Sequence, residues 1–286
     1  MMIDIHTHTF PDKIADRAVD KLSHEAHVIN HTNGTVDGLI ASMEEADVDL
    51  SVVVPVATDP SQVIKINDRA INNNEKYYFN STGRRVFSFG AIHPDFADYK
   101  AEILRIKESG MKGIKIHPVY QDTDINDIRY LNIIDFAAAN DLIVLTHAGL
   151  DVGYPGAVRC SPKMCREVID KIGDFKFILA HMGGWENWDE VPETFADTNA
   201  YIDTAFSTED LEPLSDGYWD GKDISMLGRK DVKAFVKAFG SDRILFGSDS
   251  PWTKQSRSIE FLRECGLDKE DLDKILGGNA KKLLGI

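Results

Sequence analysis

Three observations in this 286-residue sequence predict an α/β fold, a (β/α)8 TIM barrel in a single domain. Short apolar segments recur along the whole chain, and segments with helical spacing of apolar residues separate them. The length is also close to the roughly 250 residues of a single barrel. Repeated strand and helix units favour closure into a barrel, because each right-handed crossover leaves its helix on the outside.

Eight apolar segments are the candidate strands. Several are nearly continuous in Ile, Val, Leu and Phe, which is typical of parallel strands covered on both faces. The predicted strands are residues 2–6, 50–56, 86–92, 113–117, 142–147, 175–181, 200–204 and 243–249.

The segments between the strands carry helical patterns. Apolar residues fall on one face of 36–46, 99–107 and 231–239, and 269–284 is predicted to be a helix broken at Gly277-Gly278-Asn279. An open doubly wound sheet is the alternative architecture. It would need a glycine-rich phosphate turn after the first strand, where His8-Thr9-Phe10-Pro11 stands instead. Without a linker or a shift in composition, residues 1–286 are predicted to form one domain.

Composition narrows the classes of function and partner. Apolar residues make up 43% and charged residues 28%, which suits a compact globular protein. A formal charge of −15 without a basic stripe disfavours nucleic acid and anionic membrane surfaces. Three cysteines without Cys-x-x-Cys spacing, and the lack of a signal-like or ~20-residue apolar segment, predict a reduced protein of the cytoplasm.

Histidines collect at the carboxyl ends of the predicted strands. They are His6 with His8 just beyond it, then His93, His117, His147 and His181. A single histidine at a strand end is usually a hydrogen-bonded structural residue, but in a closed barrel these ends converge on one mouth. His24, His27 and His31 lie in the connection 11–35, which is predicted to be a polar, solvated loop.

A metal site follows from this arrangement. Residues two apart in a strand share a face, so His6 and His8 can point at one ion. His147 and Asp249, which follows Gly247-Ser248 at the end of the eighth strand, would bring the protein ligands to four. The sequence therefore predicts one divalent cation, with Zn²⁺ favoured and Mn²⁺ or Fe²⁺ as alternatives.

Other polar residues near these strand ends are candidates for binding substrate. Lys115 is either carboxylated and bridges two metals, or, as favoured here, is an unmodified buried cation that faces a carboxylate. His117 precedes a proline, so it ends a strand or contacts substrate. Arg159 could hold a carboxylate, although a loop arginine is more often solvated or paired with an acid. Trp252 belongs to a group of aromatic residues that suggests a flat substrate.

Asp4 shares a strand face with His6. It is predicted to hold the His6 imidazole, the alternative being an acid paired with a base at the far end of the barrel.

The motifs IDIHTH, GIKIHP, LTHAG, LAHMGG, LFGSDSPW and ILGGNAKKLLGI, in this order, resemble the amidohydrolase superfamily over nearly the whole chain. The likeness is greatest to the amidohydrolase-related (amidohydrolase 2) branch that includes aminocarboxymuconate-semialdehyde decarboxylase. This resemblance implies that His6, His8, His147 and Asp249 bind metal, with Asp249 also able to exchange a proton. It further implies that His181 is the acid/base that contacts water or substrate.

Three functions are compatible with this site. The main hypothesis is hydrolysis of an amide, ester or lactone of a small molecule by metal-activated water, because GIKIHP is more similar to hydrolase-type members. The alternative is non-oxidative decarboxylation of a small aromatic or dienoic acid. A non-catalytic metal-binding barrel is disfavoured, since stability alone does not require so many polar ligands around an open position. A homodimer is a further expectation by analogy with other barrels.

Overall fold

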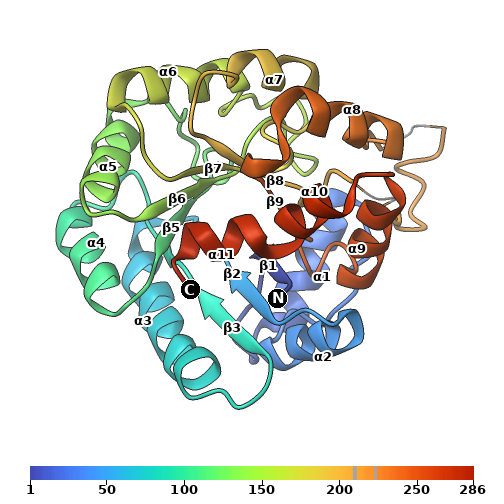
Figure 1. The fold of residues 1–286 in the computed structure, drawn as a ribbon. Coiled ribbons are helices and arrows are strands. Elements are labelled where there is room, and N and C mark those ends of the chain that lie inside the picture. Colours follow the sequence, from blue (N-terminus) through green and yellow to red (C-terminus); the bar gives the residue numbers. More distant parts are fainter. Residues whose placement is uncertain (209–210, 222–223) are drawn as a thin grey trace. The chain divides into compact units, whose positions relative to one another are not determined.

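A computed structural model describes residues 1–208, 211–221 and 224–286 (Figure 1). The chain divides into two compact units that are interleaved in the sequence. The first unit comprises 1–53, 82–86 and 204–286, and the second comprises 54–81 and 87–203. Strand β3 (Arg85–Ser88) lies where the chain passes from the first unit to the second.

The first unit contains both ends of the chain. Its elements are β1 (Ile3–Thr7), α1 (Ala15–Ala26), α2 (Val36–Ala46), β2 (Leu50–Val53), α8 (Arg229–Phe239), η4 (Ser241–Arg243), β9 (Ile244–Leu245), α9 (Gln255–Glu264), α10 (Lys269–Asp273), η5 (Lys274–Gly278) and α11 (Asn279–Leu284). Strand β1 is parallel to β2, with Ile3 opposite Leu50. On its other side, the Ile5 amide donates to the Phe246 carbonyl at 2.9 Å, so the end of the chain runs beside its beginning.

The second unit is a regular alternation of strands and helices. Its elements are η1 (Pro60–Gln62), α3 (Val63–Asn74), η2 (Glu75–Phe79), β4 (Gly90–Ala91), α4 (Tyr99–Glu108), β5 (Gly113–Ile116), α5 (Ile128–Ala139), β6 (Ile143–Thr146), α6 (Pro162–Ile172), β7 (Phe177–Leu179), η3 (Trp188–Glu190), α7 (Val191–Thr194) and β8 (Tyr201–Asp203). Strands β4 to β8 pair in sequence order, all in parallel. Figure 1 shows α4, α5 and α6 following one another beside β5, β6 and β7.

The predicted strands and helices are largely confirmed. Segment 36–46 is helix α2 with the predicted bounds, and its N-cap is Thr35, whose hydroxyl accepts from the Gly38 amide. Strands β5 and β6 are buried along their whole length, as continuous apolar segments predict. The C-terminal helix is interrupted at 274–278 as predicted, with a non-helical Gly277.

Two predictions of local structure were wrong. Segment 86–92 is not one strand. Asn74 and Asn67 of α3 pair with the backbone of Ser88 and Ala91, so these side chains take the place of ladder partners and split the segment into β3 and β4.

The connection 11–35 is not a loop throughout, because it contains helix α1. Its buried face is only Ala15, Val19 and Ser23, which is too weakly apolar to signal a helix. His24 lies on α1. His27 is not simply solvated, since its Nδ1 lies 2.7 Å from the Asp216 carboxylate and its ring stacks on Tyr218. Burial, together with Arg257 and Lys254, lowers the pKa of His31.

None of the described helices is both long enough and apolar enough to span a membrane.

Candidate metal centre

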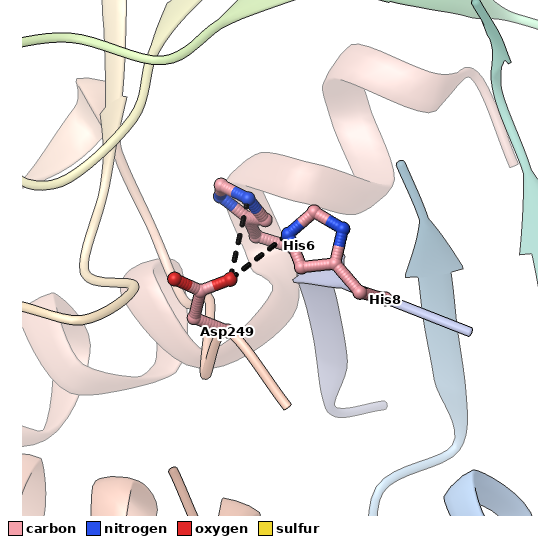
Figure 2. A group of neighbouring side chains, drawn as sticks. All are labelled: His6, His8 and Asp249. Carbon is pink, nitrogen blue, oxygen red and sulfur yellow. Dashed lines mark ion pairs between the residues drawn. The ribbon is translucent and has the colours of Figure 1, made fainter. Parts of the chain in front are cut away.

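The first unit brings His6, His8 and Asp249 together at the end of β1. Figure 2 shows both imidazoles directed at the same carboxylate oxygen of Asp249. The Nε2 atoms of His6 and His8 lie 3.6 Å and 3.0 Å from Asp249 Oδ1. The potential ligand atoms of the three residues all lie within 4.8 Å of one another. Two imidazole nitrogens and a carboxylate oxygen are a donor set suited to a Zn²⁺-like ion that keeps an open position.

Backbone pairing fixes this triad. The Asp249 amide donates to the His6 carbonyl at 2.8 Å, and the His8 amide donates to the Ser250 carbonyl at 2.7 Å. Asp249 itself has φ +65°, a left-handed conformation that is strained for a non-glycine residue and is frequent at functional sites. Gly247 permits this approach, because a Cβ there would lie 2.9 Å from the Cβ of His6.

Asp4 supports the triad in a different way from the one predicted. Its Oδ1 accepts from the backbone amides of His6 and Ser248, at 3.1 Å and 3.0 Å, and not from an imidazole. Its Oδ2 accepts from the Ser248 hydroxyl and from Gln255 Nε2. The prediction that Asp4 holds the His6 imidazole is therefore wrong, as is the alternative of an acid paired with a base. Burial raises the pKa of Asp4 to about 6, although the hydrogen bonds that the carboxylate accepts act to lower this pKa.

The second unit brings together three other predicted site residues, His117, His147 and His181. Ile116 and Thr146 are partners in the β5–β6 register, so His117 and His147 follow them side by side, with rings stacked at 4.4 Å. His147 Nδ1 lies 3.0 Å from His181 Nε2, and His147 Nε2 lies 2.9 Å from the Leu150 carbonyl oxygen. Both nitrogens of His147 thus have a partner within this unit.

The backbone of His181 is also strained and well anchored. It has φ +61°, its amide donates to Asp203 Oδ1 at 3.0 Å, and its carbonyl accepts from Trp188 Nε1 at 2.9 Å. Asp203 is completely buried at the end of β8, and its carbonyl also accepts from the Met182 amide. Such a conformation persists only where the surroundings hold it, and here they orient the His181 ring toward His147.

Sequence reasoning missed two acids of this unit, Asp151 and Asp203. Asp151 Oδ2 lies 3.7 Å from His117 Nε2 and 3.9 Å from His147 Nε2. The only signal in the sequence was its position four residues after His147. The signal for Asp203 was a carboxylate near the end of the predicted strand 200–204.

Three further predicted site residues are Lys115, Arg159 and Trp252. Lys115 is buried within β5. Arg159 is bound by Asp122 and Asp124, the latter at 3.0 Å, which corresponds to the predicted alternative of pairing with acids. Trp252 is half-buried, and its amide donates to the Asp249 carbonyl at 2.9 Å.

Comparison with solved structures shows the fold. The structure resembles an uncharacterised TIM-barrel protein of Bordetella bronchiseptica, with 17% identity, a TM-score of 0.73, and coverage of 99% of this chain and 98% of the other. It also resembles 2,6-dihydroxybenzoate decarboxylase in complex with 2,6-dihydroxybenzoate, at 14% identity, a TM-score of 0.70 and coverage of 100% and 99%. The predicted α/β barrel fold is thereby confirmed.

A third match is a probable 2-pyrone-4,6-dicarboxylic acid hydrolase of Acinetobacter baumannii, with 16% identity, a TM-score of 0.64, and coverage of 100% of this chain and 99% of the other. A similar dihydroxybenzoic acid decarboxylase of Polaromonas contains bound manganese.

Among curated proteins, none matches this chain. The family model for amidohydrolases (Amidohydro_2) matches residues 3–286, and so spans both His6-Thr7-His8 and Asp249. The resemblance that the strand-end motifs carry is therefore confirmed, and the chain belongs to the Amidohydro_2 family of amidohydrolases.

Proposed function

We propose that this protein is a metal-dependent enzyme that removes the carboxyl group of a small aromatic or dienoic acid as carbon dioxide. The observation that carries the proposal is the convergence of His6, His8 and Asp249 on one point in an amidohydrolase-family chain. Structures similar to this one include several decarboxylases of hydroxylated aromatic acids. This favours decarboxylation over the hydrolysis that the GIKIHP motif favoured.

The triad would hold the cation. Its two neutral imidazoles and one carboxylate suit Zn²⁺ or Mn²⁺, and bound manganese in a similar decarboxylase supports Mn²⁺ as well as the predicted Zn²⁺. When bound, such an ion supplies Lewis-acid stabilisation of negative charge on a substrate oxygen. His147 as a fourth ligand of this ion stays a prediction of the sequence.

His181 is the proposed acid. Decarboxylation breaks the bond between the carboxyl carbon and the ring, and a proton must replace carbon dioxide on the ring carbon. His181 is buried, and both its backbone amide and its backbone carbonyl are hydrogen-bonded. Its Nε2 is 3.0 Å from the His147 imidazole. A positioned imidazole can act as a general acid toward a substrate atom within its reach. Asp249, predicted to exchange a proton, is proposed mainly as a ligand.

Binding of the substrate carboxylate requires a cation or hydrogen-bond donors. Lys115, His117, Arg159 and Trp252 remain proposed substrate-binding residues. Of these, Arg159 is already engaged by Asp122 and Asp124, so it would have to exchange those partners to hold a substrate carboxylate. The buried Lys115 and His117 are the stronger proposals.

Hydrolysis is the second candidate, and it is supported by the similarity to a probable 2-pyrone-4,6-dicarboxylic acid hydrolase. In this reaction His181 or Asp249 would accept a proton from water as it attacks a carbonyl carbon. The substrate would be a small amide, ester or lactone.

The two reactions differ in their products. Protein loaded with Mn²⁺ or Zn²⁺ is incubated with 2,6-dihydroxybenzoate, 5-carboxyvanillate and 2-pyrone-4,6-dicarboxylate, and carbon dioxide and released acid are both measured. Carbon dioxide release that is lost in Asp249→Asn supports the decarboxylase. Release of acid without carbon dioxide supports the hydrolase and overturns the main proposal. Arg129→Lys, a change on an exposed ion pair at the start of α5, is the control variant.

A further inference from the structure

His93 is a strand-end histidine that has no role in the site described so far. It follows β4 in the sequence Ala91-Ile92-His93-Pro94 and is 5% exposed, so the residue still borders the accessible surface. Its Nδ1 accepts from the Asp95 amide at 3.1 Å. Within residues 1–208, 211–221 and 224–286, its Nε2 forms no hydrogen bond or ion pair. The ring therefore has one nitrogen that the described part of the protein does not use.

The contact with Asp95 determines which ring nitrogen of His93 carries the proton. A neutral imidazole has one donor and one acceptor nitrogen, so an acceptor at Nδ1 leaves the proton on Nε2. Burial lowers the pKa of His93 below its usual 6.5. The Asp95 and Asp59 carboxylates oppose this shift without reversing it, and Arg129 adds to it. The ring is therefore neutral at pH 7 and presents an N–H at Nε2.

The side chain of Gln121 fixes the backbone next to His93. Its Nε2 donates at 2.8 Å to the carbonyl of Ile92, directly before His93, and its Oε1 accepts from the His117 amide at 2.8 Å. The same Nε2 also donates to the Ala57 carbonyl at 2.8 Å, and the Gln121 side chain is buried. His93 and His117 thus leave their strands at backbone positions that a single amide group joins.

Strand register places the two histidines on the same face of the sheet. Ala91 of β4 is the partner of Lys115 in β5. By the two-residue period of a strand, His93 continues the face of Ala91, and His117 continues the face of Lys115. Lys115 and His117 are both buried and are already proposed to bind substrate. His93 therefore joins these two residues at the same end of the sheet.

The donors at this strand end suit a ligand group that only accepts hydrogen bonds. The Lys115 ammonium has three donors and no acceptor, and a neutral His93 has one donor at Nε2. The two oxygens of an ionised carboxylate only accept, and hydrogen bonds to a charged oxygen are shorter and stronger than those to a neutral one. A hydroxyl group would find no acceptor for its own proton at Nε2. The chemistry of the donors thus favours a carboxylate.

We propose that His93 is a substrate-binding residue, whose Nε2–H donates to a carboxylate of the substrate beside Lys115 and His117. The inference rests on the proposed function in one respect, namely that the substrate is a small acid. It does not depend on whether this carboxylate is later removed as carbon dioxide.

Two substitutions separate substrate binding from a structural role of His93. In His93→Asn the side-chain oxygen can take the place of Nδ1 and accept from the Asp95 amide, but nothing replaces the donor at Nε2. In His93→Gln the longer side chain can place a donor where Nε2 was, but the acceptor for the Asp95 amide is lost. A structural His93 is therefore replaced better by Asn, and a substrate-binding His93 is replaced better by Gln.

The measurement is the affinity of the Zn²⁺-loaded protein for carboxylates. Each variant is titrated with 2,6-dihydroxybenzoate, 5-carboxyvanillate and 2-pyrone-4,6-dicarboxylate by isothermal titration calorimetry, with circular dichroism to check folding. We expect His93→Asn to bind about tenfold more weakly or worse, as for the loss of a hydrogen bond to a charged group, and His93→Gln to stay within about threefold of the unmodified protein. His24→Asn, the same substitution on an exposed histidine of α1, is the control and should bind like the unmodified protein.

Two results overturn the inference. One is an unchanged affinity in His93→Asn, which would leave His93 with only its contact to the Asp95 amide. The other is failure of the unmodified protein to bind any of the three carboxylates. Binding that is weakened in His93→Asn, without turnover by the unmodified protein, supports the inference and counts against the proposed function alone.

A second measurement decides if a variant does not fold or if both variants lose affinity equally. Long-range ¹H–¹⁵N correlation spectra of the unmodified, Zn²⁺-loaded protein report on each ring nitrogen of His93. The Nε2 resonance should shift as 2,6-dihydroxybenzoate is added, because a new acceptor changes the environment of its proton. An unchanged Nε2 resonance in the presence of bound 2,6-dihydroxybenzoate overturns the inference.

Discussion

Two histidines from different strand ends meet nitrogen to nitrogen, with His147 Nδ1 3.0 Å from His181 Nε2. One of these nitrogens donates and the other accepts, so the protonation of each ring is tied to that of its neighbour. The contact joins a predicted metal ligand to a predicted acid.

Replacing His181 should remove activity but not metal. His181→Ala takes away the proposed acid, and loss of a positioned acid typically lowers kcat by about 10²–10⁴-fold. Neither the triad nor the set of four ligands predicted from the sequence includes His181, so the metal content measured by mass spectrometry should stay at the unmodified level. His6→Ala should lower both the activity and the metal content. Equal metal loss in the two variants would instead identify His181 as a ligand.

Removal of metal should destabilise the protein through His8 and its neighbours. A ligand at 1,000 times its dissociation constant stabilises the folded state by about 4 kcal/mol. We expect a chelator to lower the melting temperature of the unmodified protein and to have a smaller effect on His8→Ala, measured by differential scanning calorimetry. His24→Ala, a change on the exposed face of α1, serves as the control. An unchanged melting temperature in the chelator would contradict binding at the triad.

Asp4 should make the stability of the metal-free protein fall as the pH rises. Its pKa is about 6 in the folded protein, raised by burial from 3.8. Between these values the folded state binds more protons than the unfolded state, so the free energy of unfolding decreases with pH. This loss of free energy of unfolding is absent below about pH 3.8 and complete above about pH 6. A pKa shift of this size corresponds to a loss of roughly 3 kcal/mol.

The comparison that isolates this effect is Asp4→Asn, studied by urea unfolding at several pH values in the presence of a chelator. The amide oxygen can accept from the amides of His6 and Ser248, and the buried Gln255 Oε1, which has no hydrogen-bond partner in the described structure, can accept from the new amide. The variant should lack the decrease between pH 4 and 6. An identical pH dependence in both proteins would show that another group is responsible.

Gly149 should be essential for the segment after β6, where it forms a bridge with Trp185 two residues before Asp151. Its φ is +86°, and a Cβ there would lie 2.1 Å from the Trp185 amide nitrogen, a backbone atom that cannot move aside. Gly149→Ala should therefore lower the free energy of unfolding by more than the ~1 kcal/mol of a left-handed alanine. Gly156→Ala is the control, since Gly156 has φ +90° but nothing within 4 Å of the added atom. Equal losses in thermal unfolding would show that the contact with Trp185 is unimportant.

The alternation of strands and helices could be read from the sequence where apolar periodicity was strong. Helix α2 has the predicted bounds because its buried face, which includes Leu39 and Met43, repeats at helical spacing and Thr35 caps it. Helix α1 escaped prediction because Ala15 and Ser23 give little apolar signal. The split of segment 86–92 could not be predicted either, because it depends on the side chains of Asn67 and Asn74, which come from helix α3.

Within the candidate site, the sequence by itself determined the triad. His6 and His8 share a strand face by a fixed two-residue period, and Asp249 ends an apolar strand that had to lie near them in a barrel. Only the tertiary structure decided what surrounds each imidazole. Asp151 lies 3.7 Å and 3.9 Å from the Nε2 atoms of His117 and His147. Asp4 accepts from backbone amides through one oxygen, while the Ser248 hydroxyl and Gln255 donate to the other. Strand period is a local property of the chain, whereas these partners are fixed by side chains that meet only after folding.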